Sequence, residues 1–116
     1  MIDFKTGDIF LVNFDPSIGH EYKKIRPAIV IQSEKTIKNS ALITIMPITS
    51  QLSNCRKEDI NIKKSAINGL YSDSLVKVGC VHSFDRKRFL KRIGNIPEET
   101  MAKIIEYLRI HFNIPA

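Results

Sequence analysis

The sequence predicts a mainly β protein that ends in an α-helix, folded as a small barrel or curled sheet. Short runs rich in β-branched residues are separated by polar links, which favours antiparallel strands. No helical pattern alternates with these runs, as it would in a parallel α/β sheet. One run with helical periodicity closes the chain. We expect residues 1–116 to form a single domain, because this length is enough for a hydrophobic core that needs no metal ion or disulfide for stability.

The expected strands follow one another in chain order. The first begins after Gly7 and ends at the turn signal Asp15-Pro16. The polar stretch 33–40 allows one helical turn, and residues 51–58, which carry few apolar side chains, are expected to form the most mobile loop. The strands are predicted at Asp8–Phe14, Pro27–Gln32, Ala41–Pro47, Asp59–Lys63 and Ser74–His82.

The last predicted element is a helix that starts at Pro97. Proline suits a first helical turn, and Glu98 and Glu99 complement the helix dipole there, as Arg109 and His111 do near the other end. The stripe expected to pack on the sheet contains Met101, Ile104, Ile105, Leu108 and Phe112.

The charge of the chain favours a polyanionic partner. The net charge is +6 and the isoelectric point about 9.5, and lysines and arginines that neutralise phosphates gain affinity by releasing counterions. Residues 61–116 hold ten Lys and Arg against five Asp and Glu, so most of the excess lies there. The densest part is Asp85–Arg92, which fits either an RNA-facing strip or a solvated turn.

Cysteine and histidine usage predicts neither a disulfide framework nor a metal site. Cys55 and Cys80 are too few and too far apart, and His20, His82 and His111 form no metal-ligand motif. The chain starts without a secretory signal pattern and has no apolar run of membrane-spanning length. We therefore expect a cytoplasmic protein with reduced thiols, no cofactor and no membrane contact.

A polar loop between the first two strands carries the strongest functional signal. It begins at Ser17 and gathers His20, Glu21 and Arg26 within seven residues. Loops held by rigid strands are where binding and catalytic groups tend to lie.

Several motifs in and around this loop occur in a characteristic order. They resemble the MazF/PemK family of type II toxins, which are endoribonucleases, and a weaker likeness continues through Asp73-Ser74 and Asp85–Arg88 to the terminal helix. The motifs are Gly7-Asp8, Asn13-Phe14-Asp15-Pro16, Gly19-His20-Glu21, Arg26-Pro27-Ala28-Ile29-Val30 and Pro47-Ile48-Thr49-Ser50.

The resemblance implies both a fold and an activity. The fold would be an SH3-like barrel of the PemK/MazF/CcdB type. The activity would be metal-independent, sequence-selective cleavage of single-stranded mRNA that leaves a cyclic phosphate. The partners would be a second copy of the chain, with RNA along the dimer interface, and an antitoxin whose acidic flexible tail covers the same groove.

Two catalytic residues stand out. The Arg26 guanidinium can bind two phosphoryl oxygens and stays charged, so it suits transition-state stabilisation or proton donation. The alternative is that Arg26 forms an ion pair with Glu21 that only holds the loop. Thr49 lies where the family carries a catalytic or phosphate-binding hydroxyl, although a Thr-Ser pair after a strand is more often a turn.

Other side chains complete the predicted site. His20 can act as a general acid or base, and Glu21 can accept a proton or orient Arg26. Tyr22, Tyr71 and Phe84 are aromatic residues that either stack on bases or pack in the protein. The predicted RNA-binding residues are Ser17, Lys23, Lys24, Ser50, Gln51, Lys77, His82 and Ser83.

One segment departs from the PemK/Kid branch of the family. Where that branch has an arginine, an acid and a glutamine, this chain has Lys77, Gly79 and Cys80. The mechanism of that branch therefore does not transfer whole. Two alternatives stay open: a non-catalytic gyrase poison of the CcdB kind, and a basic barrel that only binds nucleic acid.

Overall fold

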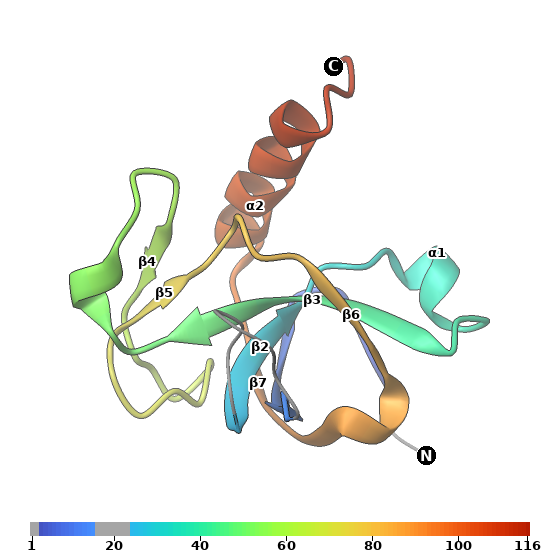
Figure 1. Cartoon of the computed structure of the whole chain (residues 1–116), viewed down its shortest axis with the longest axis horizontal. Helices are drawn as coiled ribbons and strands as arrows, with labels where there is room; N and C mark the ends of the chain where they lie inside the picture. Colours follow the sequence, from blue (N-terminus) through green and yellow to red (C-terminus); the bar gives the residue numbers. More distant parts are fainter. Residues whose placement is uncertain (1–2, 16–23) are drawn as a thin grey trace.

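The computed structural model describes residues 3–15 and 24–116. In these ranges the chain forms a curled antiparallel sheet followed by a C-terminal helix (Figure 1). This confirms the predicted fold class. The elements are β1 Asp8–Asn13, β2 Ile25–Val30, α1 Glu34–Ile37, β3 Leu42–Thr49, the 3-10 turn η1 Leu52–Asn54, β4 Ile60–Ile62, β5 Ser74–Val76, β6 His82–Asp85, the 3-10 turn η2 Arg86–Arg88, β7 Phe89–Asn95 and α2 Glu98–His111.

Strand β3 is the centre of the sheet. The strand order is β4-β5-β3-β2-β1-β7, and β6 also pairs with β3. The start of β3, Leu42 to Ile45, pairs with β6, whereas its end, Ile48 and Thr49, pairs with β5. Every pairing between described strands is antiparallel. The sheet therefore curls around β3, and the chain crosses from β6 to β7 through η2.

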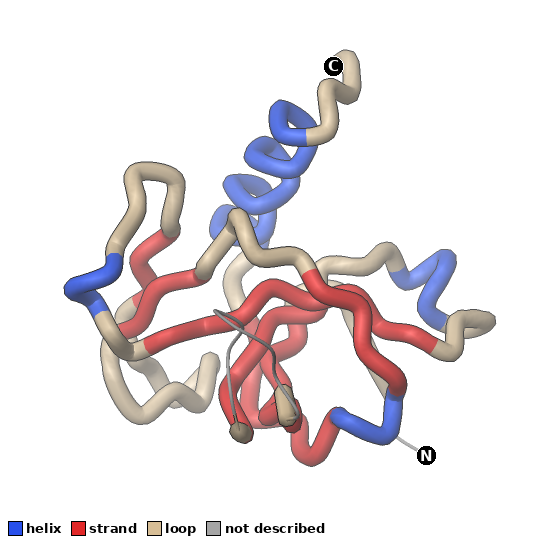
Figure 2. The backbone as a smooth tube through the Cα atoms, viewed as in Figure 1, coloured by secondary structure: helices blue, strands red, loops and turns tan. Residues whose placement is uncertain are grey.

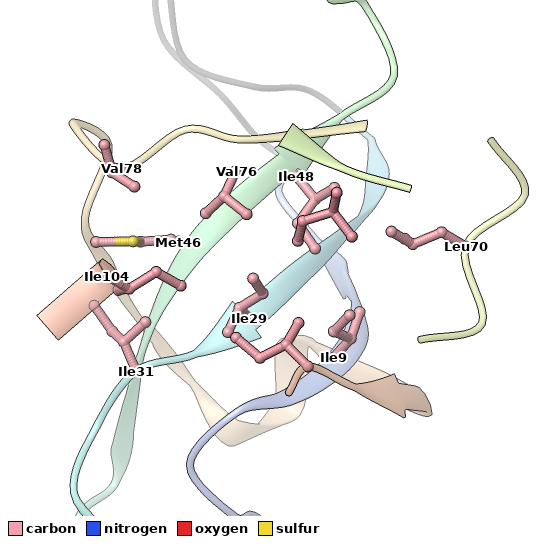
Figure 3. Close-up of a cluster of buried hydrophobic side chains, with 11 residues drawn as sticks. Ile9, Ile29, Ile31, Met46, Ile48, Leu70, Val76, Val78 and Ile104 are labelled. Atoms are coloured by element: carbon pink, nitrogen blue, oxygen red, sulfur yellow. The ribbon is translucent and has the colours of Figure 1, made fainter. Parts of the chain in front are cut away.

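Alternation along the strands builds two hydrophobic clusters, one on each face of the curled sheet. On β2, for example, Ile29 joins one cluster while Ala28 and Val30 join the other, because successive side chains point to opposite faces. Ile104 of α2 belongs to the cluster that contains Ile29 and Met46 (Figure 3). The second cluster holds Phe4, Phe10, Val12, Phe14, Ala28, Val30, Ile37, Ile43, Ile45 and Phe89.

Helix α2 is confirmed, but only part of its predicted stripe is buried. Pro97 is the N-cap, and Ile104 is fully buried in the core. Ile105 and Phe112 are 49% and 58% exposed, against the prediction. Met101, Ile104 and Leu108 form the packed stripe, and Ile105, the residue after Ile104, points away from it because successive helical residues are about 100° apart. The C-terminal end of α2 points away from the strands (Figure 2).

The predicted strand Ser74–His82 is observed only in part: Ser74–Val76 forms β5, but the strand does not continue to His82. The chain leaves the sheet after Val76, where Val78 N–H donates to Val76 O and Cys80 N–H donates to Lys77 O, and it returns as β6 at His82. These tight turns let the chain pair with β3 at both of its ends. The predicted helical turn in 33–40 is confirmed as α1, whose N-cap is Ser33.

Strand β7 was not predicted. The charged run Asp85–Arg92 forms the last residue of β6, the turn η2 and the first half of β7, which pairs with β1. Only Phe89 in this half is buried, while Leu90, Lys91 and Arg92 are exposed, so the run has no strand-like alternation. Among the described residues, no helix is long and apolar enough to cross a membrane.

Candidate active site

The two ends of the first loop lie together, at the margins of the described residues. Phe14 N–H donates to Lys24 O at 2.8 Å, and Lys24 N–H donates to the Asp15 carboxylate, also at 2.8 Å. Lys24 is exposed and has a left-handed backbone with φ of 63°. Four predicted site residues, Ser17, His20, Glu21 and Lys23, lie outside the described residues.

Arg26 and Thr49 lie on neighbouring strands and face the same side of the sheet. In the register of β2 with β3, Ala28 pairs with Pro47. Arg26 precedes Ala28 by two residues on β2, and Thr49 follows Pro47 by two residues on β3, so the two lie at the same end of these antiparallel strands. Residues two apart on a strand share a face, so both side chains lie on the face of Ala28 and Pro47. The strand order thus places the two predicted catalytic residues on one face of adjacent strands.

Thr49 is held at the end of β3. The residue is 4% exposed and pairs with Leu75 of β5. Its hydroxyl oxygen accepts the Gln51 N–H at 3.2 Å, which leaves the hydroxyl hydrogen for donation. Ser50 and Gln51, which follow it, are exposed.

His82 shares the face of Arg26 and Thr49. It pairs with Ile45, which lies on the same face of β3 as Thr49 by strand alternation. The imidazole stacks on the Phe84 ring, with centroids 5.5 Å apart and 5° between planes, and lies nearly perpendicular to the Phe14 ring, with centroids 6.1 Å apart. An imidazole, a guanidinium and a hydroxyl thus occupy one face of the sheet.

Ser83 is not part of this group. It alternates with His82 and therefore points to the other face of β6, where its hydroxyl lies 2.7 Å from the Thr44 hydroxyl. The structure does not bring it together with His82.

A cavity of about 240 Å³ opens beside Arg26. Its lining includes Ser50, Tyr71 and Lys91 in addition to Arg26. Tyr71 is 97% exposed, so its ring does not pack in the core. The sequence offered Lys91 only as one residue of the charged run. Its place in this lining follows from the pairing of Lys91 with Leu11, which no local pattern indicated.

Lys77 has a different environment. Its ammonium is buried, forms an ion pair with Asp59 and donates to Asn54 O at 3.0 Å. Lys77, Gly79 and Cys80 line a separate cavity of about 760 Å³, and Arg26 and Ser50 are not in its lining. Burial raises the pKa of the Cys80 thiol, and the nearby Lys77 ammonium opposes this rise. The structure therefore does not bring Lys77 together with the other predicted RNA-binding residues.

Among residues 3–15 and 24–116, no three His, Cys, Asp or Glu side chains gather into a potential metal site. Arg26, Thr49 and His82 share one face of the sheet, and side chains of these types are suited to binding and cleaving a phosphodiester. A guanidinium can hold two phosphoryl oxygens, a hydroxyl can donate to a third, and an imidazole can transfer a proton.

The chain is similar to known proteins over nearly its whole length. A family described as "PemK-like, MazF-like toxin of type II toxin-antitoxin system" matches residues 5–112. Endoribonuclease MazF9 of Mycobacterium tuberculosis is 25% identical over 115 residues, which cover 95% of this chain and 97% of the relative. Endoribonuclease EndoA of Bacillus subtilis is 27% identical over 109 residues, 91% of each chain.

A solved structure gives the same fold. An endoribonuclease from a mycobacterial species, in complex with its cognate antitoxin, superposes with a TM-score of 0.77 at 13% identity. The match covers 100% of this chain and 99% of that one.

Proposed function

Because this chain belongs to the PemK/MazF family of type II toxins, we propose that it is an endoribonuclease that cuts single-stranded mRNA. The relatives from M. tuberculosis and B. subtilis are named endoribonucleases and match it over nearly their whole length. We further propose that it acts in the cytoplasm, where mRNA is found, and that it requires no metal ion.

The observation that carries the proposal is the shared face of Arg26 and Thr49. Cleavage by the 2′-hydroxyl forms a bond from O2′ to phosphorus and breaks the bond from phosphorus to the 5′ oxygen. Negative charge grows on the phosphoryl oxygens as this happens. The Arg26 guanidinium would hold two of these oxygens and the Thr49 hydroxyl would donate a hydrogen bond to the phosphoryl group.

Two proton transfers complete the reaction. A base removes the proton of the 2′-hydroxyl, and an acid protonates the leaving 5′ oxygen, so the products are a 2′,3′-cyclic phosphate and a free 5′-hydroxyl. We assign these transfers to His20 and Glu21, with His82 as a further candidate because it lies on the same face as Thr49. Gly79 offers no carboxylate for either task.

The proposed RNA contacts come from segments next to Arg26 and Thr49 in the chain and from the cavity that Arg26 borders. Ser17, Lys23 and Lys24 belong to the first loop, while Ser50 and Gln51 follow Thr49. Lys91 and Tyr71 line the cavity beside Arg26, where they could meet a phosphate and a base.

Two protein partners are proposed as well. The mycobacterial endoribonuclease was solved with its cognate antitoxin, and the net charge of +6 on this chain would attract an acidic antitoxin tail. We also propose a homodimer, as the family resemblance implies. The gyrase-poison alternative is not favoured, since the named relatives are endoribonucleases.

Cleavage of a long single-stranded RNA in EDTA tests the proposal. Wild type should cut at a short shared sequence, and Arg26→Ala should be slower by about 10²- to 10³-fold, the usual loss when one donor to a developing oxyanion is removed. Thr49→Ala should show a smaller loss. Arg109→Ala is the matched control, because it removes a guanidinium that pairs only with Glu106 and Ile114 O among the described contacts, at the far end of α2.

Thermal melts should show that all variants are folded. No cutting by folded wild type on several RNAs would overturn the proposal and favour a basic barrel that only binds nucleic acid. Cutting by wild type and by Arg26→Ala at equal rates would instead refute the role of Arg26 alone.

A further inference from the structure

Arg88 joins strand ends that are distant in sequence. Its Nη1 donates to Asn13 O at 3.1 Å and to Asp15 O at 2.6 Å. Its guanidinium carbon also lies 5.1 Å from the centroid of the Phe84 ring. One side chain from η2 thus contacts the end of β1 and the side chain of a β6 residue.

The contact with β1 extends to Arg26 through the strand pairing. Asn13 pairs with Ile25 and Val12 pairs with Arg26, so Arg88 holds the carbonyl next to the pair that contains Arg26. The Asp15 carboxylate accepts Lys24 N–H at 2.8 Å. Arg88 therefore fixes the end of β1, and the pairing carries that constraint to the start of β2.

The contact with β6 extends to His82 through an aromatic cluster. Phe84 stacks on the His82 imidazole, and the Phe14 ring packs perpendicular to both. Stacked and edge-to-face rings have preferred geometries, so displacement of one ring tilts its neighbours. A guanidinium over Phe84 therefore helps to fix the plane of the imidazole.

We infer that Arg88 is a positioning residue for RNA cleavage, which sets Arg26 and His82 in place relative to each other. The inference rests on the proposed endoribonuclease activity. Its physical basis is that catalytic groups must be held closely in the productive geometry, since a misplacement of about 1 Å can lower the rate roughly 100-fold. Arg88 contacts the support of both groups, one on β2 and one on β6.

The chain contains a matched control in the same turn. Arg86 has contacts of the same kind as Arg88: its guanidinium donates to the carbonyls of Ser40 and Ile37, and it lies 5.1 Å from the Phe4 centroid. These partners are in and around α1 and the N-terminal segment, not beside Arg26 or His82. Arg86→Ala and Arg88→Ala should therefore lose similar contacts, but only Arg88→Ala should disturb the site.

The experiment compares wild type, Arg86→Ala, Arg88→Ala and Arg88→Lys, each checked by thermal melting. Single-turnover cleavage gives the rate of the chemical step, and binding is measured with an RNA that has 2′-deoxy at the cut nucleotide. For Arg88→Ala we expect cleavage to fall by roughly 100-fold relative to Arg86→Ala, with an unchanged Kd for the uncleavable RNA. Arg88→Lys, which keeps the charge but not the two-carbonyl geometry, should recover only part of the rate.

Two results would overturn the inference. Equal cleavage by folded Arg86→Ala and Arg88→Ala would make Arg88 merely structural. The other result is that Arg88→Ala raises the Kd for RNA and lowers the salt dependence of binding by about one charge, but cleaves at the normal rate when saturated with RNA. Arg88 would then be a phosphate contact. An inactive wild type would instead refute the proposed function, so the two failures are distinguishable.

Discussion

The buried ion pair between Lys77 and Asp59 gives a sharp test of where Lys77 acts. The side chains are 8% and 1% exposed, and Asn54 O is the other partner of the ammonium. The Asp59 carboxylate also accepts Arg56 N–H at 2.8 Å. We expect Lys77→Met or Asp59→Asn alone to be strongly destabilising, because each leaves one buried charge without its partner.

The magnitude follows from the burial of both groups. Breaking a buried pair by removing one partner costs about 3–5 kcal/mol. For 116 residues the entropy of unfolding is roughly 0.24 kcal/mol/K, so the melting temperature should fall by about 12–20 °C. The double variant Lys77→Met with Asp59→Asn keeps an oxygen for Arg56 N–H and leaves no unpaired charge. Its loss of stability should be smaller than the sum of the losses in the two single variants.

Urea unfolding at 25 °C and thermal melts of all four proteins measure this coupling, and RNA binding is measured beside them. A Lys77→Met variant with unchanged stability but weaker RNA binding would refute the reasoning. Lys77 would then act as the RNA-binding residue that the sequence suggested.

The remaining predictions concern packing and thiol chemistry. Gly94→Ala should lower the free energy of unfolding in urea by at least about 1–3 kcal/mol, because the new Cβ would lie 2.3 Å from Ile67 O. Gly79→Ala is the control, since its Cβ would meet only the Tyr107 hydroxyl at 3.7 Å and Glu58 at 4.0 Å. Its free energy of unfolding should change little. An equal loss of unfolding free energy in the two variants would contradict the proposed collision of the new Cβ with Ile67 O. Iodoacetamide should label Cys80 more slowly than exposed Cys55 at pH 8, since burial raises the Cys80 pKa and lowers its thiolate fraction. Peptide mass spectrometry measures both rates, which should converge as pH rises; faster labelling of Cys80 at pH 8 would contradict this prediction.

Strands with a local signal were predictable. β1, β2 and β3 contain runs of β-branched residues bounded by turn residues, and α2 has a clear start at Pro97 and a helical period. The predicted bounds of these three strands differ from the observed ones by up to two residues. The family motifs likewise lie in short segments, so the amino-acid sequence alone carries the resemblance.

Strand β7 and the break after Val76 had no such signal. β7 is ordered by its pairing with β1 and by the ion pair of Arg92 with the buried Asp8, while Lys91 and Arg92 stay largely exposed. A stretch of exposed charged residues has no alternation of apolar and polar side chains, so the sequence alone does not indicate a strand. The break after Val76 exists because the two ends of β3 take different partners, which is a property of the whole sheet.

The sequence by itself determined the fold class, the terminal helix, the family and the residue types of the site, because these depend on local patterns. Only the tertiary structure decided that Arg26 and Thr49 share a face, that Lys77 is buried against Asp59, and that Arg88 contacts the end of β1. Arg88 and Asn13 are 75 residues apart along the chain. Contacts at such separations are set by strand register and packing, and no spacing within the sequence encodes them directly.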